Sequence, residues 1–131
     1  MALPLPARIF TVCGALSAAL AVSLGAAATH LPPLVQAATN PSFQTALQLQ
    51  QFHALGLIAC GLIATRLVNS RWVQGAGILF IFGSLFFSGN LYLRFLAGID
   101  AFRAFVPWGG GAWILGWLAL AIGVAAARKE A

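Results

Sequence analysis

The stretch from Gly75 to Ala97 constrains the fold more than any other, because it is apolar for about the thickness of a bilayer's hydrocarbon core. Within it lies the densest set of hydrogen-bonding side chains of any apolar segment, namely Ser84, Ser88, Asn90, Tyr92 and Arg94. At helical spacing the small and polar residues fall on two adjacent stripes, and the opposite side carries Leu79, Phe82, Phe86 and Leu93. The pattern predicts a membrane-spanning helix whose polar side packs on protein and whose apolar side faces lipid.

The composition indicates an integral membrane protein. Of the 131 residues, 61% are hydrophobic and 7% are charged, whereas about a quarter of a soluble domain is charged. The length suits one domain, so residues 1–131 are predicted to form a single membrane domain in the lipid bilayer. The formal net charge of +5 comes from basic residues at segment ends, without a basic cluster interleaved with aromatic residues. Nucleic acid is therefore not an expected partner.

The apolar segments predict an all-α fold, an integral membrane four-helix bundle with helices at about 9–29, 41–68, 74–97 and 108–127. Pro32-Pro33 is expected to stop the first helix, and Asn40-Pro41 is a start signal with Asn as the N-cap. A signal peptide is a competing interpretation of the first segment, because Arg8 precedes an apolar run that ends in an Ala-x-Ala sequence. The run is long for the core of a signal peptide, which favours a transmembrane helix.

Small residues are expected where helices touch, because they let two backbones approach closely inside a membrane. In the first predicted helix they form a stripe that includes Gly25, and in the third they include Ser88 and Gly89. The fourth has glycines seven residues apart, a spacing typical of a left-handed packing seam, at Gly109, Gly116 and Gly123. The glutamine-rich first turns of the second helix are expected to stand in the headgroups or in water.

The distribution of charge predicts that both termini face the cytoplasm. With four spans, the termini share one side with the loop between the second and third helices. That side holds Arg8, Arg66, Arg71, Arg128 and Lys129. The other side holds Arg103 and, by snorkelling, Arg94, partly offset by Asp100. The positive-inside rule then gives an N-in/C-in bundle in a bacterial inner (cytoplasmic) membrane.

Two histidines and the only tyrosine are the main candidates for a site. His30 ends the first helix and His53 sits early in the second, so we expect them to meet near the outer face, directly or through Tyr92 or water. Such a cluster could ligate a metal or haem, hold a quinone or relay a proton. No acid or thiol stands at ligand spacing beside the histidines, so we expect no metal and no cofactor, and favour structural hydrogen bonds between helices.

Asn90 and Arg94 lie one helical turn apart and could bind an anionic headgroup or a carboxylate. The favoured interpretation is that Arg94 snorkels to the interface while Asn90 bonds a neighbouring helix. The only acids are Asp100 and the terminal Glu130, so neither paired carboxylates nor a Ser/His/Asp set can be assembled. The sequence therefore predicts no catalytic residues and no enzyme.

The remaining aromatic and sulfur side chains are expected to be structural. Trp108, Trp113 and Trp117 are predicted to be interface anchors and packing groups. Cys13 and Cys60 lie inside apolar segments without a partner at thiol-metal spacing, which favours small buried hydrophobes.

Four strings occur together in order: LGAAATH (24–30), QTALQLQQFHAL (44–55), LFIFGSLFFSGNLY (79–92) and PWGGGAWILGW (107–117). Through these strings the chain resembles the YgdD-like family of small uncharacterised inner-membrane proteins, a domain-of-unknown-function family. The resemblance covers nearly the whole chain, although the tyrosine usual four residues before the second histidine is Leu49 here. It implies four transmembrane helices and no established activity.

The predicted role is non-enzymatic: an accessory, assembly or stabilising subunit that packs against a larger membrane complex, with a membrane-protein partner or a homo-oligomer. Small size and small-residue faces on all four helices support this hypothesis. The alternative is a small-solute or proton pathway, or a haem, metal or quinone site, at the outer-face cluster of His30, His53 and Tyr92. Polar groups concentrate in the outer half of the predicted bundle, which disfavours a path across the whole membrane.

Overall fold

The computed structural model describes residues 1–128; Lys129, which enters the charge count above, lies outside them. The described chain is built from helices and their connections. In order, the elements are α1 (Leu5–His30), α2 (Pro32–Ala38), α3 (Pro41–Ala64), α4 (Arg71–Gly83), the π-helix η1 (Ser84–Gly89), α5 (Asn90–Ala97), the 3-10 turn η2 (Arg103–Phe105) and α6 (Val106–Ala125).

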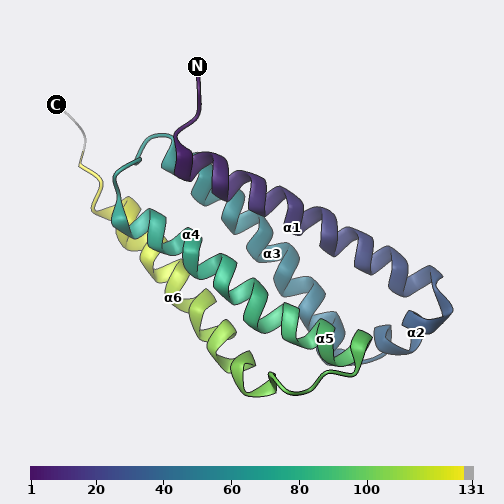
Figure 1. Ribbon diagram of the computed structural model, residues 1–131. Helices are drawn as coiled ribbons and strands as arrows, with labels where there is room; N and C mark the ends of the chain where they lie inside the picture. The colour runs from purple at the N-terminus through teal and green to yellow at the C-terminus, as the bar shows by residue number, and fades with distance from the viewer. Residues whose placement is uncertain (129–131) are drawn as a thin grey trace.

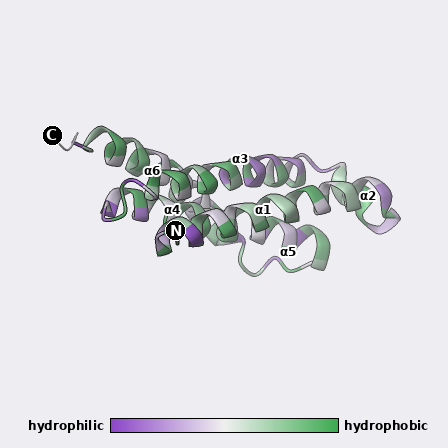
Figure 2. Ribbon diagram, turned by 90° about the horizontal axis from the view of Figure 1, so that it is seen from above, coloured by the Kyte–Doolittle hydropathy of each residue, from purple (hydrophilic) through white to green (hydrophobic). Residues whose placement is uncertain are grey.

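Four spans are long and apolar enough to cross a membrane: α1, α3, the continuous segment from α4 through α5, and η2 with α6. They form an antiparallel bundle in which α1 packs on α3, α4 packs on α6, and α3 also contacts α4 (Figure 1). The start of α1, the α3–α4 connection and the end of α6 lie at one end, and α2 lies at the other (Figure 1). Along α3, hydrophilic residues gather in the half nearer α2 (Figure 2).

Prolines and one asparagine set the helix starts. The Asn40 side chain accepts a hydrogen bond from the Ser42 backbone N–H at 2.9 Å, which confirms the predicted N-cap. Pro6 sits in the first turn of α1, which begins earlier than predicted, because a proline lacks only an N–H that has no helical partner there. For the same reason Pro32-Pro33 does more than end the first helix: the pair occupies the first turn of α2, a helix that the sequence analysis did not predict.

The third predicted helix is interrupted by a π-helical turn at η1. This turn closes wider hydrogen-bonded rings than an α-helix, so residues after it are rotated relative to an uninterrupted helix. Beside this turn, the Asn90 side-chain amide donates a hydrogen bond to the Phe86 backbone carbonyl at 2.6 Å. The span ends at Gly98, whose positive φ of 69° forms a left-handed C-cap.

Glycines bring α6 against α4. A Cβ atom at Gly116 would lie 2.7 Å from the ring of Phe80, and one at Gly123 would lie 2.9 Å from Trp72 Cβ. Gly109 meets η1 in the same way, with its added Cβ 2.5 Å from the Phe87 backbone nitrogen. The structure thus places all three glycines of the seven-residue repeat at one helix contact.

Two other predicted packing glycines do not pack. A Cβ added to Gly25 meets nothing within 4 Å, whereas one added to Gly14 would lie 2.7 Å from the Ala54 carbonyl oxygen of α3. A Cβ at Gly89 meets only the Ser84 carbonyl oxygen, at an ordinary 3.7 Å, since Gly89 faces an open groove. Ser88, in contrast, is buried and donates to the Ala46 carbonyl of α3 at 2.8 Å.

Replacing Gly116 by Leu should destabilise the bundle by about 1–3 kcal/mol, because the new side chain must displace the ring of Phe80. The measurement is the thermal unfolding midpoint in mild detergent. Gly25→Leu is the matched control and should leave the midpoint unchanged. Equal losses in the two variants would contradict the assignment of the α4–α6 contact.

Candidate functional site

His53 is a buried polar residue whose ring is fixed by two hydrogen bonds and several aromatic contacts. It lies on α3, about 18 Å along the helix from Pro41, and its side chain is buried. The Trp117 indole N–H donates to His53 Nε2 at 3.1 Å, and His53 Nδ1 lies 2.7 Å from the Leu49 carbonyl. An indole can only donate and a carbonyl can only accept, so the neutral imidazole carries its hydrogen on Nδ1.

Aromatic rings surround this imidazole on several sides. The ring of Trp113 stacks on it with centroids 4.0 Å apart and planes 3° from parallel. Phe80 of α4 and Phe52 of α3 meet it edge to face at 5.6 and 5.3 Å. His53 therefore ties α3 to α4 and α6 in the middle of the bundle.

The two ring nitrogens of His53 are both occupied by bonds within the protein. Ligation through either nitrogen would require giving up the Trp117 donor or the Leu49 acceptor. Among residues 1–128, no three His, Cys, Asp or Glu side chains gather closely enough to hold a metal ion. The arrangement of His53 is that of a structural junction between helices.

The predicted meeting of His30 with His53 is wrong. His30 is the last residue of α1 and is exposed. His53 lies in the middle of α3, and its two ring nitrogens are hydrogen-bonded to Leu49 of α3 and Trp117 of α6. Tyr92 does not join them, because its hydroxyl bonds Gln50 instead. Sequence spacing placed His53 too near the end of the bundle that holds α2, since about three turns of α3 separate His53 from that end.

Gln50 is the polar residue that the sequence analysis placed wrongly, in the headgroups or water. Its side chain is 4% exposed and forms a link between three helices. Its Nε2 donates to the Ser17 backbone carbonyl at 3.1 Å and to Ser17 Oγ at 3.3 Å, and its Oε1 accepts from the Tyr92 hydroxyl. One feature of the sequence could have predicted the burial of Gln50: it lies on the same face of α3 as His53, one turn away.

Asn90 and Arg94 do not form the joint site that the sequence analysis gave as the alternative. The Asn90 side-chain amide donates to the Phe86 carbonyl of its own span rather than to a neighbouring helix. Arg94 is exposed and its Nε lies 3.4 Å from Asp100 Oδ1, an ion pair at the bundle end. Such exposed pairs contribute little stability.

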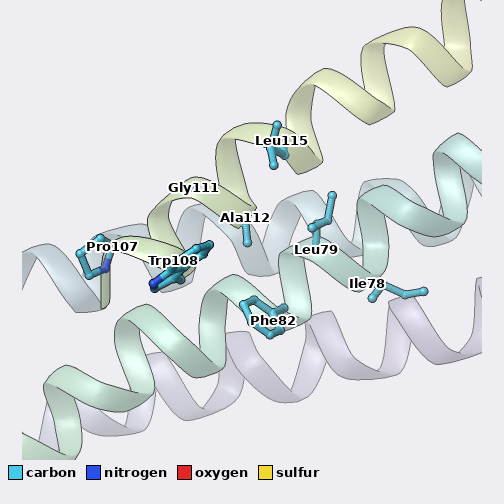
Figure 3. A pocket seen from close by; sticks show the side chains of 8 residues that line it. All are labelled: Ile78, Leu79, Phe82, Pro107, Trp108, Gly111, Ala112 and Leu115. Atoms are coloured by element: carbon cyan, nitrogen blue, oxygen red, sulfur yellow. The ribbon is translucent and has the colours of Figure 1, made fainter. Parts of the chain in front are cut away.

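Two grooves open on the membrane-facing surface. The first lies between α4 and α6, with a cavity volume of about 490 Å³ and an almost wholly non-polar lining that includes Leu79, Phe82 and Trp108 (Figure 3). The second, of about 320 Å³, lies between α1 and the α4–α5 span, and polar side chains contribute to its lining. These are Ser17, Gln50, Ser84 and Tyr92.

Four apolar spans, joined by hydrogen bonds and glycine contacts in their interior, define a small polytopic α-helical membrane protein. The chain belongs to the family described as protein of unknown function DUF423, whose model matches residues 24–110. The predicted membership of a YgdD-like uncharacterised membrane family is thereby confirmed.

The relatives are named by location alone. A UPF0382 membrane protein of Staphylococcus saprophyticus is 41% identical over 118 residues, covering 88% of this chain and 96% of the relative. The UPF0382 membrane protein YwdK of Bacillus subtilis is 34% identical, covering 88% and 94%. The UPF0382 inner membrane protein YgdD of Escherichia coli is 26% identical, covering 94% of each chain. No solved structure matches the chain.

Together with the four spans, these names bear out the predicted localisation: the chain is a multi-pass protein of the inner membrane.

Replacing His53 by Phe should lower stability by about 1 kcal/mol or more, because the buried Trp117 N–H loses its acceptor. The unfolding midpoint in detergent measures this loss, and His30→Phe, at an exposed position, is the control with no expected change. Combining His53→Phe with Trp117→Phe should cost less than the sum of the two single changes. Strict additivity would show that the bond does not couple the residues.

Proposed function

We propose that the protein is a non-catalytic accessory or stabilising subunit that packs through the outer face of α1 against another membrane protein. The observation that carries the proposal is a row of small, exposed residues on α1, pointing away from α3: Ala15, Ala19, Ser23 and Ala26. Small residues at this spacing let another helix approach closely, whereas large side chains serve as well against lipid.

The other exposed surfaces differ from this row. On α6, most exposed positions are large, as at Leu115, Leu118 and Ile122, which suits lipid tails; Ala121 and Ala125 are the small ones. Helix α1 is also the least buried of the four spans within the bundle. The Ser23 hydroxyl donates to the Ala19 carbonyl at 2.8 Å, so the one hydroxyl in this row already has a hydrogen-bond partner within α1. These features favour a second protein over lipid on this face.

The bundle interior supports a role without chemistry. Its polar side chains form hydrogen bonds between helices, as at His53, Gln50 and Ser88. Within residues 1–128, no buried side-chain nitrogen or oxygen lacks a hydrogen-bond partner. A catalytic site commonly holds groups with perturbed or incomplete interactions, and this interior instead resembles a scaffold.

A photo-crosslinking amino acid at position 19 should form a discrete adduct with a different protein in intact cells. The same amino acid at Leu118, an exposed large residue of α6, should form none. Mass analysis of the adduct and a native gel of the complex in mild detergent provide the readout. Ala19→Leu should release the chain from the complex without lowering its unfolding midpoint.

Two outcomes would contradict the accessory role. An adduct with twice the mass of the chain would assign the α1 face to self-association. Equal, diffuse labelling at positions 19 and 118 would show that lipid covers both surfaces.

The proposed orientation is N-in/C-in, supported by the basic residues at the end of the bundle that holds the α3–α4 connection, such as Arg66 and Arg71. A cysteine introduced at exposed Ser42, at the other end, should react with an impermeant maleimide in intact cells. A cysteine at exposed Asn69 should react only after permeabilisation. The reverse pattern would invert the bundle.

A further inference from the structure

The groove between α1 and the α4–α5 span, called the polar groove below, is not part of the accessory contact proposed above. Helix α3 lies between α1 and α4 (Figure 1), and its residues Gln50 and Leu57 line the groove. The groove has a volume of about 320 Å³ and opens sideways toward lipid. Its walls are apolar at Leu16, Leu20 and Leu85, and its polar residues come from α1, α3 and the α4–α5 span.

The polar residues sit at the depth of the hydrocarbon core. Ser17 lies about 18 Å along α1 from Leu5 and about 20 Å from His30, which is the middle of the span. Gln50 and Tyr92 are bonded at the same level, since Gln50 donates to Ser17 and accepts from Tyr92. Polar groups at this depth are costly unless they are paired or serve a ligand.

The pairing within the groove leaves one donor available. The Ser17 hydroxyl oxygen accepts from Gln50 Nε2 at 3.3 Å, and none of the hydrogen bonds among residues 1–128 uses the Ser17 hydroxyl hydrogen. A serine hydroxyl rotates to suit its surroundings, so this hydrogen can turn to an acceptor in the groove. In hydrocarbon no water competes for it.

We propose that this groove binds a lipid-soluble molecule with a carbonyl-bearing ring and a long apolar tail, the chemistry of a quinone. The carbonyl oxygen accepts from the Ser17 hydroxyl beside Gln50 and Tyr92, and the tail leaves through the lateral opening. Phospholipid ester carbonyls lie at the membrane interface, too shallow for a residue at mid-span, whereas a quinone ring enters the hydrocarbon. The groove between α4 and α6 is lined almost wholly by apolar groups, with the Trp108 indole as its only polar side chain, and suits lipid tails (Figure 3).

Gly89 gives a means of closing the groove without disturbing the bundle. It lines the groove, and a Cβ there meets only the Ser84 carbonyl at an ordinary 3.7 Å. A leucine at this position would project into the space proposed for the ring. Gly25→Leu adds the same side chain at an open position outside the groove and is the matched control.

The test uses the whole chain in phosphatidylcholine nanodiscs with a diazirine-tailed analogue of decylubiquinone. Illumination should give an adduct whose modified peptides contain groove residues such as Cys13, Leu16 or Leu85. Unlabelled decylubiquinone should compete for the adduct, and decylbenzene, which has a tail and a ring but no carbonyl, should not. Ser17→Ala should raise the competing concentration about threefold, the effect of one hydrogen bond in a membrane.

Gly89→Leu should abolish the adduct and Gly25→Leu should retain it, with the unfolding midpoints of both variants unchanged in detergent. Equal competition by decylbenzene would overturn the proposal and assign the groove to lipid tails. Adducts that map to the α4–α6 groove, or that persist in Gly89→Leu, would overturn it as well. Neither result bears on the accessory role, whose contact lies on the outer face of α1.

Discussion

The close approach of α6 to α4 is the contact on which the interior of this bundle depends. Gly109, Gly116 and Gly123 remove the side chains that would hold the two helices apart. At that separation Phe80 packs against Gly116, and the indoles of α6 reach across to α3. His53 then finds a stacked ring and a hydrogen-bond donor at once. In hydrocarbon there is no hydrophobic force between helices, so such packing and polar contacts are what assemble the bundle.

Helix α3 is the element around which the others are arranged. It is the least apolar of the four spans and the most buried, whereas α1 is the most apolar and the least buried. The physical reason is that lipid tolerates few polar side chains, so the helix that carries them must be covered by protein. Ser88 and Tyr92 cover it from the α4–α5 span, Ser17 from α1 and Trp117 from α6.

The spans and the glycine repeat could be predicted from the sequence, because hydropathy and residue spacing are local properties of a single helix. The partners of His53 and Gln50 could not, since Trp117 and Tyr92 lie far along the chain from them and meet them only in the folded bundle. The π-turn at η1 also escaped prediction. It breaks the helical period assumed for the third span, and Gly89, which was expected at a helix contact, lies within this turn and faces a groove.

The row of small residues and the polar groove both involve α1, and this connects the two proposals. The small row on α1 begins at Ala15 and the polar groove includes Leu16 and Ser17, so a helix docked on the row lies beside the mouth of the groove. Apart from its contacts with α2 and α3, α1 touches the rest of the bundle little. A partner that shifts α1 therefore changes the width of the groove more readily than it disturbs the α4–α6 contact or the bonds of His53. On this architecture, the proposed partner and the proposed carbonyl ligand would be coupled through the position of α1, and each would change the affinity of the other by the same factor.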